Sequence, residues 1–154
     1  MKIKNLQDKQ FPPNYHKLEA LCLDWQFWPY TQILDCLSKP EYQLCVIEDY
    51  IDAPSKWPGA LLSYHGPFSI DIVYLYINPK HRGRGLAASL LESLWATVSK
   101  EATMEALFLE VRKSNTSAIR AYDKFGMKQI GVRKSYYEDG EDALVFSREK
   151  NLES

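Results

Sequence analysis

Two glycines in a basic turn, Gly83 and Gly85, are the residues whose spacing most clearly suggests a chemical role. They stand in the segment Lys-His-Arg-Gly-Arg-Gly at 80–85, between an apolar run at 69–78 and a run with helical spacing that begins at Leu86. Glycine lets the backbone approach a ligand without a Cβ atom, and the free N–H groups of a helix's first turn attract anions. The segment therefore predicts a site for a phosphate-bearing cofactor.

Other interpretations of this turn have less support. The G-x-G-x-x-A dinucleotide pattern also fits residues 83–88, but five residues separate it from the preceding strand, and the remaining chain is too short for a second nucleotide-binding half. No G-x-x-x-x-G-K-[ST] P-loop occurs. A turn that only starts a helix is the structural alternative. Against it, four basic groups would repel one another without an anion, namely Lys80, His81, Arg82 and Arg84.

Two side chains further along the chain have the types that proton transfer requires. Strict alternation over 107–112 places Glu110 on the same strand face as Phe108 and Arg112. Tyr122 lies on the apolar stripe of a predicted helix. From the residues alone, an ion-paired or solvated Glu110 and a core Tyr122 are the favoured interpretations, and roles as acid or base are the alternatives.

The elements that must position these residues alternate between strands and helices. Strands are predicted at 2–6, 43–47, 59–64, 69–78, 105–112, 128–136 and 143–148, and helices at 14–25, 31–37, 86–99 and 115–125. Thr31 is expected to cap the second helix, and Gly126 to end the fourth. Only the connection through 86–99 is long enough to join parallel strands. The predicted fold is a mixed α/β sheet in a single domain, residues 1–154.

Composition narrows the classes of function. The 154 residues carry 19 Lys and Arg against 20 Asp and Glu, a net charge of -1, so bulk charge gives no reason to expect nucleic-acid or membrane partners. No apolar run reaches the roughly 20 residues of a membrane helix. The three cysteines lack C-x-x-C spacing and are expected to be reduced core thiols, which favours a cytoplasmic protein. The scattered histidines predict no metal site.

Several motifs together resemble those of a known family. Residues 82–87 are similar to the R/Q-x-x-G-x-G/A signature of the GNAT acyl-CoA N-acetyltransferases, in its usual place between the fourth strand and the third helix. The likeness continues through LEVRKSN at 109–115, AIRAY at 118–122, FGM at 125–127 and YYEDGEDA at 136–143. Within the superfamily, the chain resembles the RimI-type ribosomal-protein alanine N-acetyltransferases. The resemblance implies a mostly antiparallel sheet with about four helices and a parallel strand pair at the cofactor cleft.

The resemblance also implies roles for individual residues, with acetyl-CoA as the cofactor. The pantetheine arm is expected to pair with the backbone of Leu75, Tyr76 and Ile77, and Asn115 to touch the cofactor. The residues implied at the pyrophosphate end are Arg82, Gly83, Arg84, Gly85, Leu86, Ala87 and Ala88. Glu110 becomes the general base, acting through water, and Tyr122 the general acid for the leaving thiolate. Because a thioester is already reactive, direct attack in a ternary complex is expected, without a cysteine nucleophile.

The amine acceptor is less closely defined. An α-amine has a pKa of about 7.7 to 8 and a lysine side chain one of about 10.4, so at neutral pH an N-terminus is more often in the neutral, nucleophilic form. This difference mildly favours N-terminal substrates. The resemblance implies the N-terminal alanine of a ribosomal protein. Candidate substrate contacts are Tyr136, Tyr137 and Trp28, the last in a segment that departs from the family's Phe-Pro-Trp. The acids at 138–142 either attract the peptide's ammonium group or form a solvated hairpin tip. A lysine or small-amine acetyltransferase and an inactive acyl-CoA-binding module remain as alternatives.

Overall fold

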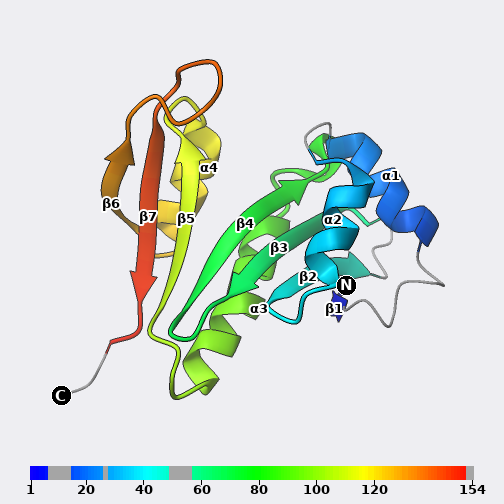
Figure 1. Ribbon diagram of the computed structural model, residues 1–154, viewed down its shortest axis with the longest axis horizontal. Coiled ribbons are helices and arrows are strands. Elements are labelled where there is room, and N and C mark those ends of the chain that lie inside the picture. The colour runs from blue at the N-terminus through cyan, green and yellow to red at the C-terminus, as the bar shows by residue number, and fades with distance from the viewer. Residues whose placement is uncertain (7–14, 26–27, 49–56, 152–154) are drawn as a thin grey trace.

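A seven-stranded sheet runs through the part of the chain that the computed structural model describes, residues 1–6, 15–25, 28–48 and 57–151 (Figure 1). Its strand order is β1-β2-β3-β4-β5-β7-β6. The strands are β1 (Lys2–Leu6), β2 (Tyr42–Glu48), β3 (Gly59–His65), β4 (Ser69–Ile77), β5 (Ala106–Arg112), β6 (Lys128–Arg133) and β7 (Ala143–Glu149). The helices are α1 (Tyr15–Trp25), α2 (Tyr30–Leu37), α3 (Leu86–Lys100) and α4 (Thr116–Lys124), with a 3₁₀ turn η3 (Pro79–His81).

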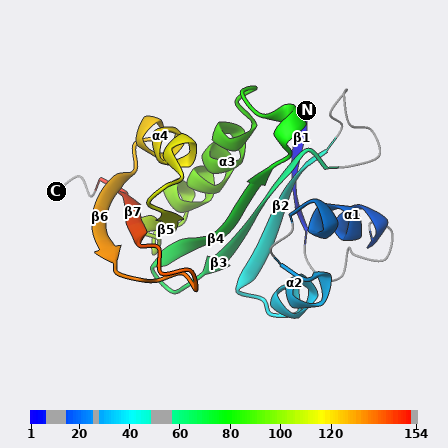
Figure 2. The same ribbon diagram turned by 90° about the horizontal axis from the view of Figure 1, so that it is seen from above.

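Helices cover both faces of the sheet, so the protein has two cores. Figure 2 shows α3 and α4 on one face and α1 and α2 on the other. Successive side chains of a strand point to opposite faces, and β2 supplies both cores in this way. Cys45 and Ile47 pack with α3, whereas Leu44 and Val46 pack with α1 and α2. Burial on both faces explains why the central strands are almost entirely apolar.

The junction of β4 and β5 is the feature that creates the site. The two strands pair in parallel only from Ser69 opposite Ala106 to Ile72 opposite Leu109. Beyond this point they diverge, as Figure 1 shows. On its other edge β4 continues to pair with β3, but the register shifts so that Leu62 lies opposite Tyr74 and Ser63 opposite Ile72. Val73 is therefore the extra residue of a β-bulge, which bends the strand at the place where β5 departs.

The structure confirms the predicted mixed α/β sheet, including its single parallel pair among the described strands. It also confirms that Gly126, at φ 91°, follows the end of α4 in the left-handed region. The predicted cap of the second helix is wrong. Pro29, not Thr31, precedes α2, because the Pro29 carbonyl accepts the N–H groups of Gln32 and Ile33 and the helix already includes Tyr30.

The end of β6 also differs from the prediction. The strand stops at Arg133 rather than at Tyr136, and Ser135 adopts a left-handed φ of 49°. Its N–H group donates to Asp142 Oδ1 at 2.9 Å, so residues 134–142 form an ordered loop in place of a tight turn. Most of the predicted long loop at 49–58 lies outside the described residues, as does Asn14 at the start of the first helix.

The three cysteines are buried free thiols, as expected. Burial raises the pKa of Cys22 and of Cys45 to about 11, so both hold their protons at neutral pH. Burial also raises the pKa of Cys36. A thiol needs to become a thiolate to act as a nucleophile, and these environments oppose that change.

Candidate active site

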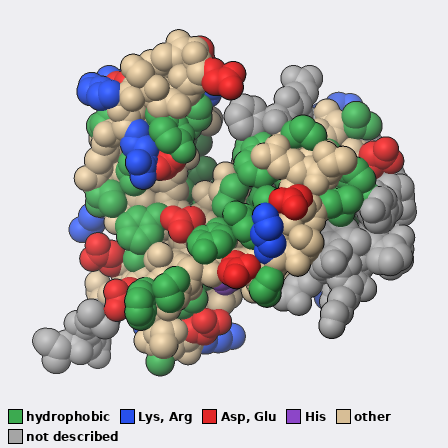
Figure 3. Space-filling view, in the orientation of Figure 1, with side chains coloured by type: hydrophobic (Ala, Val, Ile, Leu, Met, Phe, Trp, Pro, Cys, Tyr) green, Lys and Arg blue, Asp and Glu red, His purple; other side chains and the backbone are tan. Residues whose placement is uncertain are grey.

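The diverging strands enclose a cleft of about 640 Å³. In the space-filling view of Figure 3, the molecule is hollowed between the part built on β5, β7 and β6 and the part built on β3 and β4. The cleft is lined from β4 by residues 71–75 and from β5 by residues 108–112. The other lining residues are Trp28, Asn115, Tyr122, Arg133, Tyr136, Tyr137 and Val145.

Seven of the residues predicted from the sequence meet in this cleft although they come from distant segments. They are Trp28, Leu75, Glu110, Asn115, Tyr122, Tyr136 and Tyr137. Asn115 also caps α4, since its Oδ1 accepts the N–H group of Ala118 at 3.2 Å. The cleft therefore brings the candidate base, the candidate acid and the candidate substrate contacts into one volume.

The other predicted residues lie outside the lining of the cleft. The Tyr76 side chain is buried in the core under α1 and α2, and Ile77 packs against the core under α3. The positions of these side chains do not test the expected role of the two residues, which is to pair with the pantetheine arm through their backbone. Among the described strands, β4 has no partner on its β5 side beyond Ile72, so the strand edge at Leu75 can pair with an extended ligand.

Residues 82–85 form the turn between η3 and α3, and residues 86–88 are the first turn of α3. Gly83 and Gly85 have φ values of 74° and 75°, and a Cβ atom on either would have no protein atom within 4 Å. Gly85 is the N-cap of α3 and offers no side chain, and its carbonyl accepts the N–H group of Ser89 at 3.0 Å. The N–H groups of Leu86, Ala87 and Ala88, in the first turn of α3, have no helical acceptor. Arg82 Nε donates to the Ile77 carbonyl at 3.1 Å, which ties the turn to the end of β4.

Glu110 stands on the cleft side of β5 with a side chain that is 26% exposed. It forms an ion pair with Nε of Arg133 from β6. A hydrogen bond from the Tyr136 hydroxyl to Glu110 raises the pKa of Tyr136. The pKa of Asp71, on β4, is raised first by partial burial and then by repulsion from Glu110. The cleft therefore contains two carboxylates, and Arg133 pairs with one of them, Glu110.

Tyr122 is both a core residue and a cleft residue. Its side chain is only 8% exposed and packs 6.4 Å from Phe146, ring centre to ring centre. Loss of solvation, with a smaller contribution from Tyr137, raises the pKa of Tyr122 to about 12. The phenol is therefore a proton donor throughout the neutral range and not a base.

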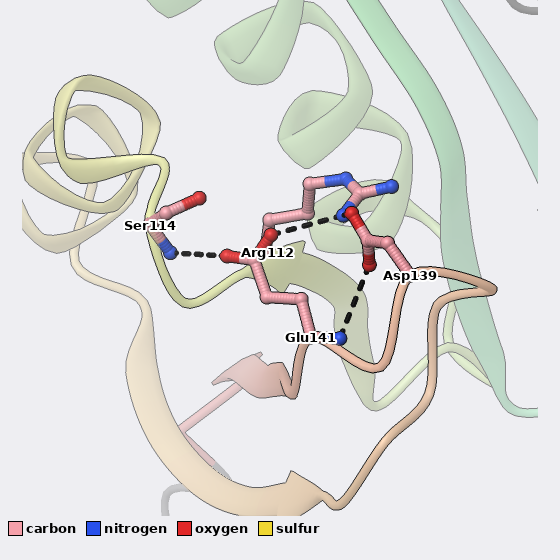
Figure 4. A network of polar contacts seen from close by, with 4 residues as sticks. All are labelled: Arg112, Ser114, Asp139 and Glu141. Atoms are coloured by element: carbon pink, nitrogen blue, oxygen red, sulfur yellow. Dashed lines mark hydrogen bonds and ion pairs between the residues drawn. The ribbon is translucent and has the colours of Figure 1, made fainter.

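Two acids of the 134–142 loop, Asp139 and Glu141, bind their own neighbours, as Figure 4 shows. Arg112 Nη1 contacts carboxylate oxygens of Asp139 at 2.8 Å and of Glu141 at 2.9 Å, and the Ser114 N–H donates to Glu141 at 2.7 Å. Hydrogen bonds from Ser114, then from Arg112, lower the pKa of Glu141. The Arg112 guanidinium also lies 4.0 Å from the ring centre of Tyr137. These carboxylates thus hold the loop and Tyr137 in place.

Ten residues of the cleft lining were not predicted as site residues, among them Asp71, Val73, Tyr74 and Arg133. One signal for the bulge was available. The apolar positions in SIDIVYLYIN are even at Ile70 and Ile72 but odd at Leu75 and Ile77, although all four contribute to the same core. Such a phase change within one strand indicates an extra residue.

Related sequences include two that are named as N-acetyltransferases. An N-alpha-acetyltransferase of Saccharolobus solfataricus is 38% identical over 77 residues, which cover 50% of this chain and 46% of the relative. A putative ribosomal protein bS18-alanine N-acetyltransferase of Bacillus subtilis is 41% identical over 92 residues, covering 56% and 60%. The alignments thus span about half the length of these relatives.

Solved structures share the fold over nearly the whole chain. The ribosomal-protein-S18-alanine N-acetyltransferase of Escherichia coli matches with a TM-score of 0.77 at 24% identity, covering 96% of this chain and 92% of the other. Arabidopsis thaliana NAA60 in complex with acetyl-CoA matches with a TM-score of 0.80 at 16% identity, covering 97% and 98%. The model of the Acetyltransferase (GNAT) family matches residues 2–127. This protein therefore belongs to the GNAT acetyltransferase family.

Proposed function

We propose that this protein is an acetyl-CoA-dependent N-acetyltransferase that acetylates the α-amino group of a protein, with the N-terminal alanine of a ribosomal protein as the acceptor. The observation that carries the proposal is the cleft in which Glu110 and Tyr122 meet the aromatic pair Tyr136 and Tyr137. The relatives named as ribosomal-protein alanine N-acetyltransferases, from Bacillus subtilis and Escherichia coli, support the choice of acceptor.

Acetyl-CoA is the acetyl donor that GNAT acetyltransferases use, and the residues of this chain fit it. The glycine turn at 82–85 leaves room for the pyrophosphate, and the N–H groups of residues 86–88, which have no helical acceptor, can donate to it. The unpaired edge of β4 at Leu75 suits an extended amide-bearing arm. When bound, acetyl-CoA supplies an acetyl group that its thioester has already activated.

The protein's own contribution is proton transfer and positioning. Glu110 is the candidate base that takes a proton from the acceptor's ammonium group through water. Tyr122 lines the same cleft and holds a proton at Oη, which it could donate to the departing thiolate, and its raised pKa keeps that proton in place until then. None of the three buried cysteines lines the cleft, so the proposal requires no acyl-cysteine.

The acceptor contacts are aromatic. The Tyr136 ring is 51% exposed and meets Tyr137 edge to face with 5.2 Å between centres. Trp28, which precedes α2, lines the cleft together with this pair. Large rings with a polar edge give contact area to an extended peptide at a small entropy cost.

Thiol release from acetyl-CoA tests the proposal most directly. The assay compares a peptide that begins with alanine, the same peptide with a blocked N-terminus and an internal lysine, and a set of polyamines. We expect release with the first peptide only, and release mainly with lysine or polyamines would assign the other acceptor class. Glu110→Gln should abolish most of the release, whereas Glu92→Gln, on α3 outside the cleft, should not.

Mass spectrometry of protein N-termini from cells with and without the gene tests the acceptor itself. We expect an alanine N-terminus of a ribosomal protein to lose its acetyl group when the gene is absent. Unchanged acetylation of all ribosomal N-termini would contradict the assignment of the acceptor.

A further inference from the structure

The carboxylate of Glu110 already has two partners in this structure. Arg133 forms an ion pair with Oε1, and the Tyr136 hydroxyl is hydrogen bonded to the same carboxylate. A base engaged by a guanidinium has its charge neutralised on that side. A cationic amine that approaches Glu110 must therefore compete with at least one of these partners.

Arg133 is the partner that can leave more easily. Its side chain is 58% exposed, and it lies at the end of β6, an edge strand that pairs, among the described strands, with β7 alone. Its other described contact is a distant one, 5.9 Å from the guanidinium carbon to the ring centre of Tyr136. Ion pairs with such exposure are weak, so exchange for another cation costs little.

The remaining charges near Glu110 favour such an exchange. Asp71 faces it from β4, and the hydroxyls of Tyr136 and Tyr137 face it from the loop after β6. Arg112, the other arginine of the cleft, is bound to Asp139 and Glu141. When Arg133 moves away, two carboxylates without a guanidinium counter-ion are left to receive a positive group.

We propose that Arg133 occupies the position of the acceptor's ammonium group in the free enzyme and that a cationic amine displaces it from Glu110 on binding. This inference rests on the proposed function and adds to it a class of acceptor. Amines that arrive charged replace Arg133, whereas neutral groups leave the ion pair intact. Arg133 thus acts through Glu110 as a positioning residue.

Calorimetry with two forms of one peptide tests this exchange. The probe is an amidated six-residue peptide that begins with alanine and carries no other charge, and its comparison is the Nα-acetylated form, both titrated in the presence of coenzyme A. Arg133→Gln should bind the free-amine peptide about two- to five-fold more tightly than the unchanged protein, the range that an exposed ion pair supplies. Its affinity for the acetylated peptide should be unchanged.

Two further variants test whether the gain in affinity comes from removing Arg133 itself or from removing any nearby positive charge. Lys134→Gln removes the neighbouring cation, which is 80% exposed and paired with Asp142, and should leave both affinities unchanged. Arg133→Lys keeps the charge and should bind like the unchanged protein. An equal gain with Lys134→Gln, an equal gain for the acetylated peptide, or weaker binding of the free amine by Arg133→Gln would overturn the proposal.

These measurements and the thiol-release assay distinguish a failure of the proposed function from a failure of the exchange at Glu110. If the unchanged protein transfers no acetyl group to the free-amine peptide while the affinity difference persists, the proposed function is wrong and the exchange at Glu110 stands. If acetyl transfer occurs but Arg133→Gln gains no affinity for the free amine, the exchange is wrong and the proposed function stands.

Discussion

Removing the hydroxyl of Tyr122 distinguishes a packing role from a chemical one. Tyr122→Phe keeps the ring against Phe146, so the free energy of unfolding at pH 7 should change by no more than about 1 kcal/mol. If Oη is the proton donor, kcat should fall about 10²- to 10⁴-fold. That loss corresponds to about 3 to 5 kcal/mol of barrier. The two effects differ enough to be separated.

The same substitution should change the response of stability to alkali. The folded protein raises the pKa of Tyr122 from 10.0 to about 12. A raised folded-state pKa contributes stability that is present below pH 10 and is lost as the pH rises toward 12. At 1.36 kcal/mol per pH unit the loss is about 3 kcal/mol, and the Phe variant should lack it.

Thiol release at pH 7 and urea denaturation between pH 7 and pH 12 measure the two effects. Tyr42→Phe is the matched control, because Tyr42 pairs with Tyr64 outside the cleft and should affect neither turnover nor the cleft. A folded Tyr122→Phe protein with unchanged kcat would remove Tyr122 from the chemistry. A variant that is unfolded at pH 7 would show that packing is its main role.

Three other variants test separate parts of the site. Glu110→Gln should lower kcat, most strongly at low pH, where amine deprotonation is hardest, and leave coenzyme A affinity intact; an unchanged pH–rate profile would exclude it as the base. Gly85→Ala should cost about 1 kcal/mol in thermal denaturation because φ is 75°, and should weaken coenzyme A binding in calorimetry, whereas Gly131→Ala should not affect binding. Glu141→Gln should raise the acceptor KM without changing that of acetyl-CoA, since it frees the loop that carries Tyr137; equal changes in both constants would contradict this. Because the pKa of Glu141 is lowered, the loop contacts should persist at neutral pH and fail only in acid.

Local patterns were sufficient to predict most of the elements and the face that each presents. The alternation of β5 correctly put Glu110 on the opposite face from Leu107 and Leu109, which the structure buries, because residues of a strand point to alternate faces whatever the strand's neighbours. The glycine turn was predictable for a similar reason. A positive φ at Gly85 is a local backbone requirement that few other residues meet.

Features that depend on distant segments were not predictable. The insertion of β7 between β5 and β6 follows from long-range pairing, for which adjacent residues give no signal. The ion pair between Arg133 and Glu110 depends on that order too, since it joins side chains of two strands that β7 separates. The role of the loop acids depends on Arg112, whose contacts with Asp139 and Glu141 no sequence spacing indicates.

The short ladder between β4 and β5, four residue pairs long, has a thermodynamic consequence. Any molecule that lies along the open edge of β4 and also touches β5 or α4 bridges the two halves of the sheet. Such a molecule binds only the native chain, so the free energy of unfolding should rise with its concentration, by about 2.7 kcal/mol at one hundred times its Kd. The melting temperature should increase accordingly. Amide hydrogen exchange at residues 73–77 should slow in parallel, and a ligand bound in this way would be a structural component of the sheet.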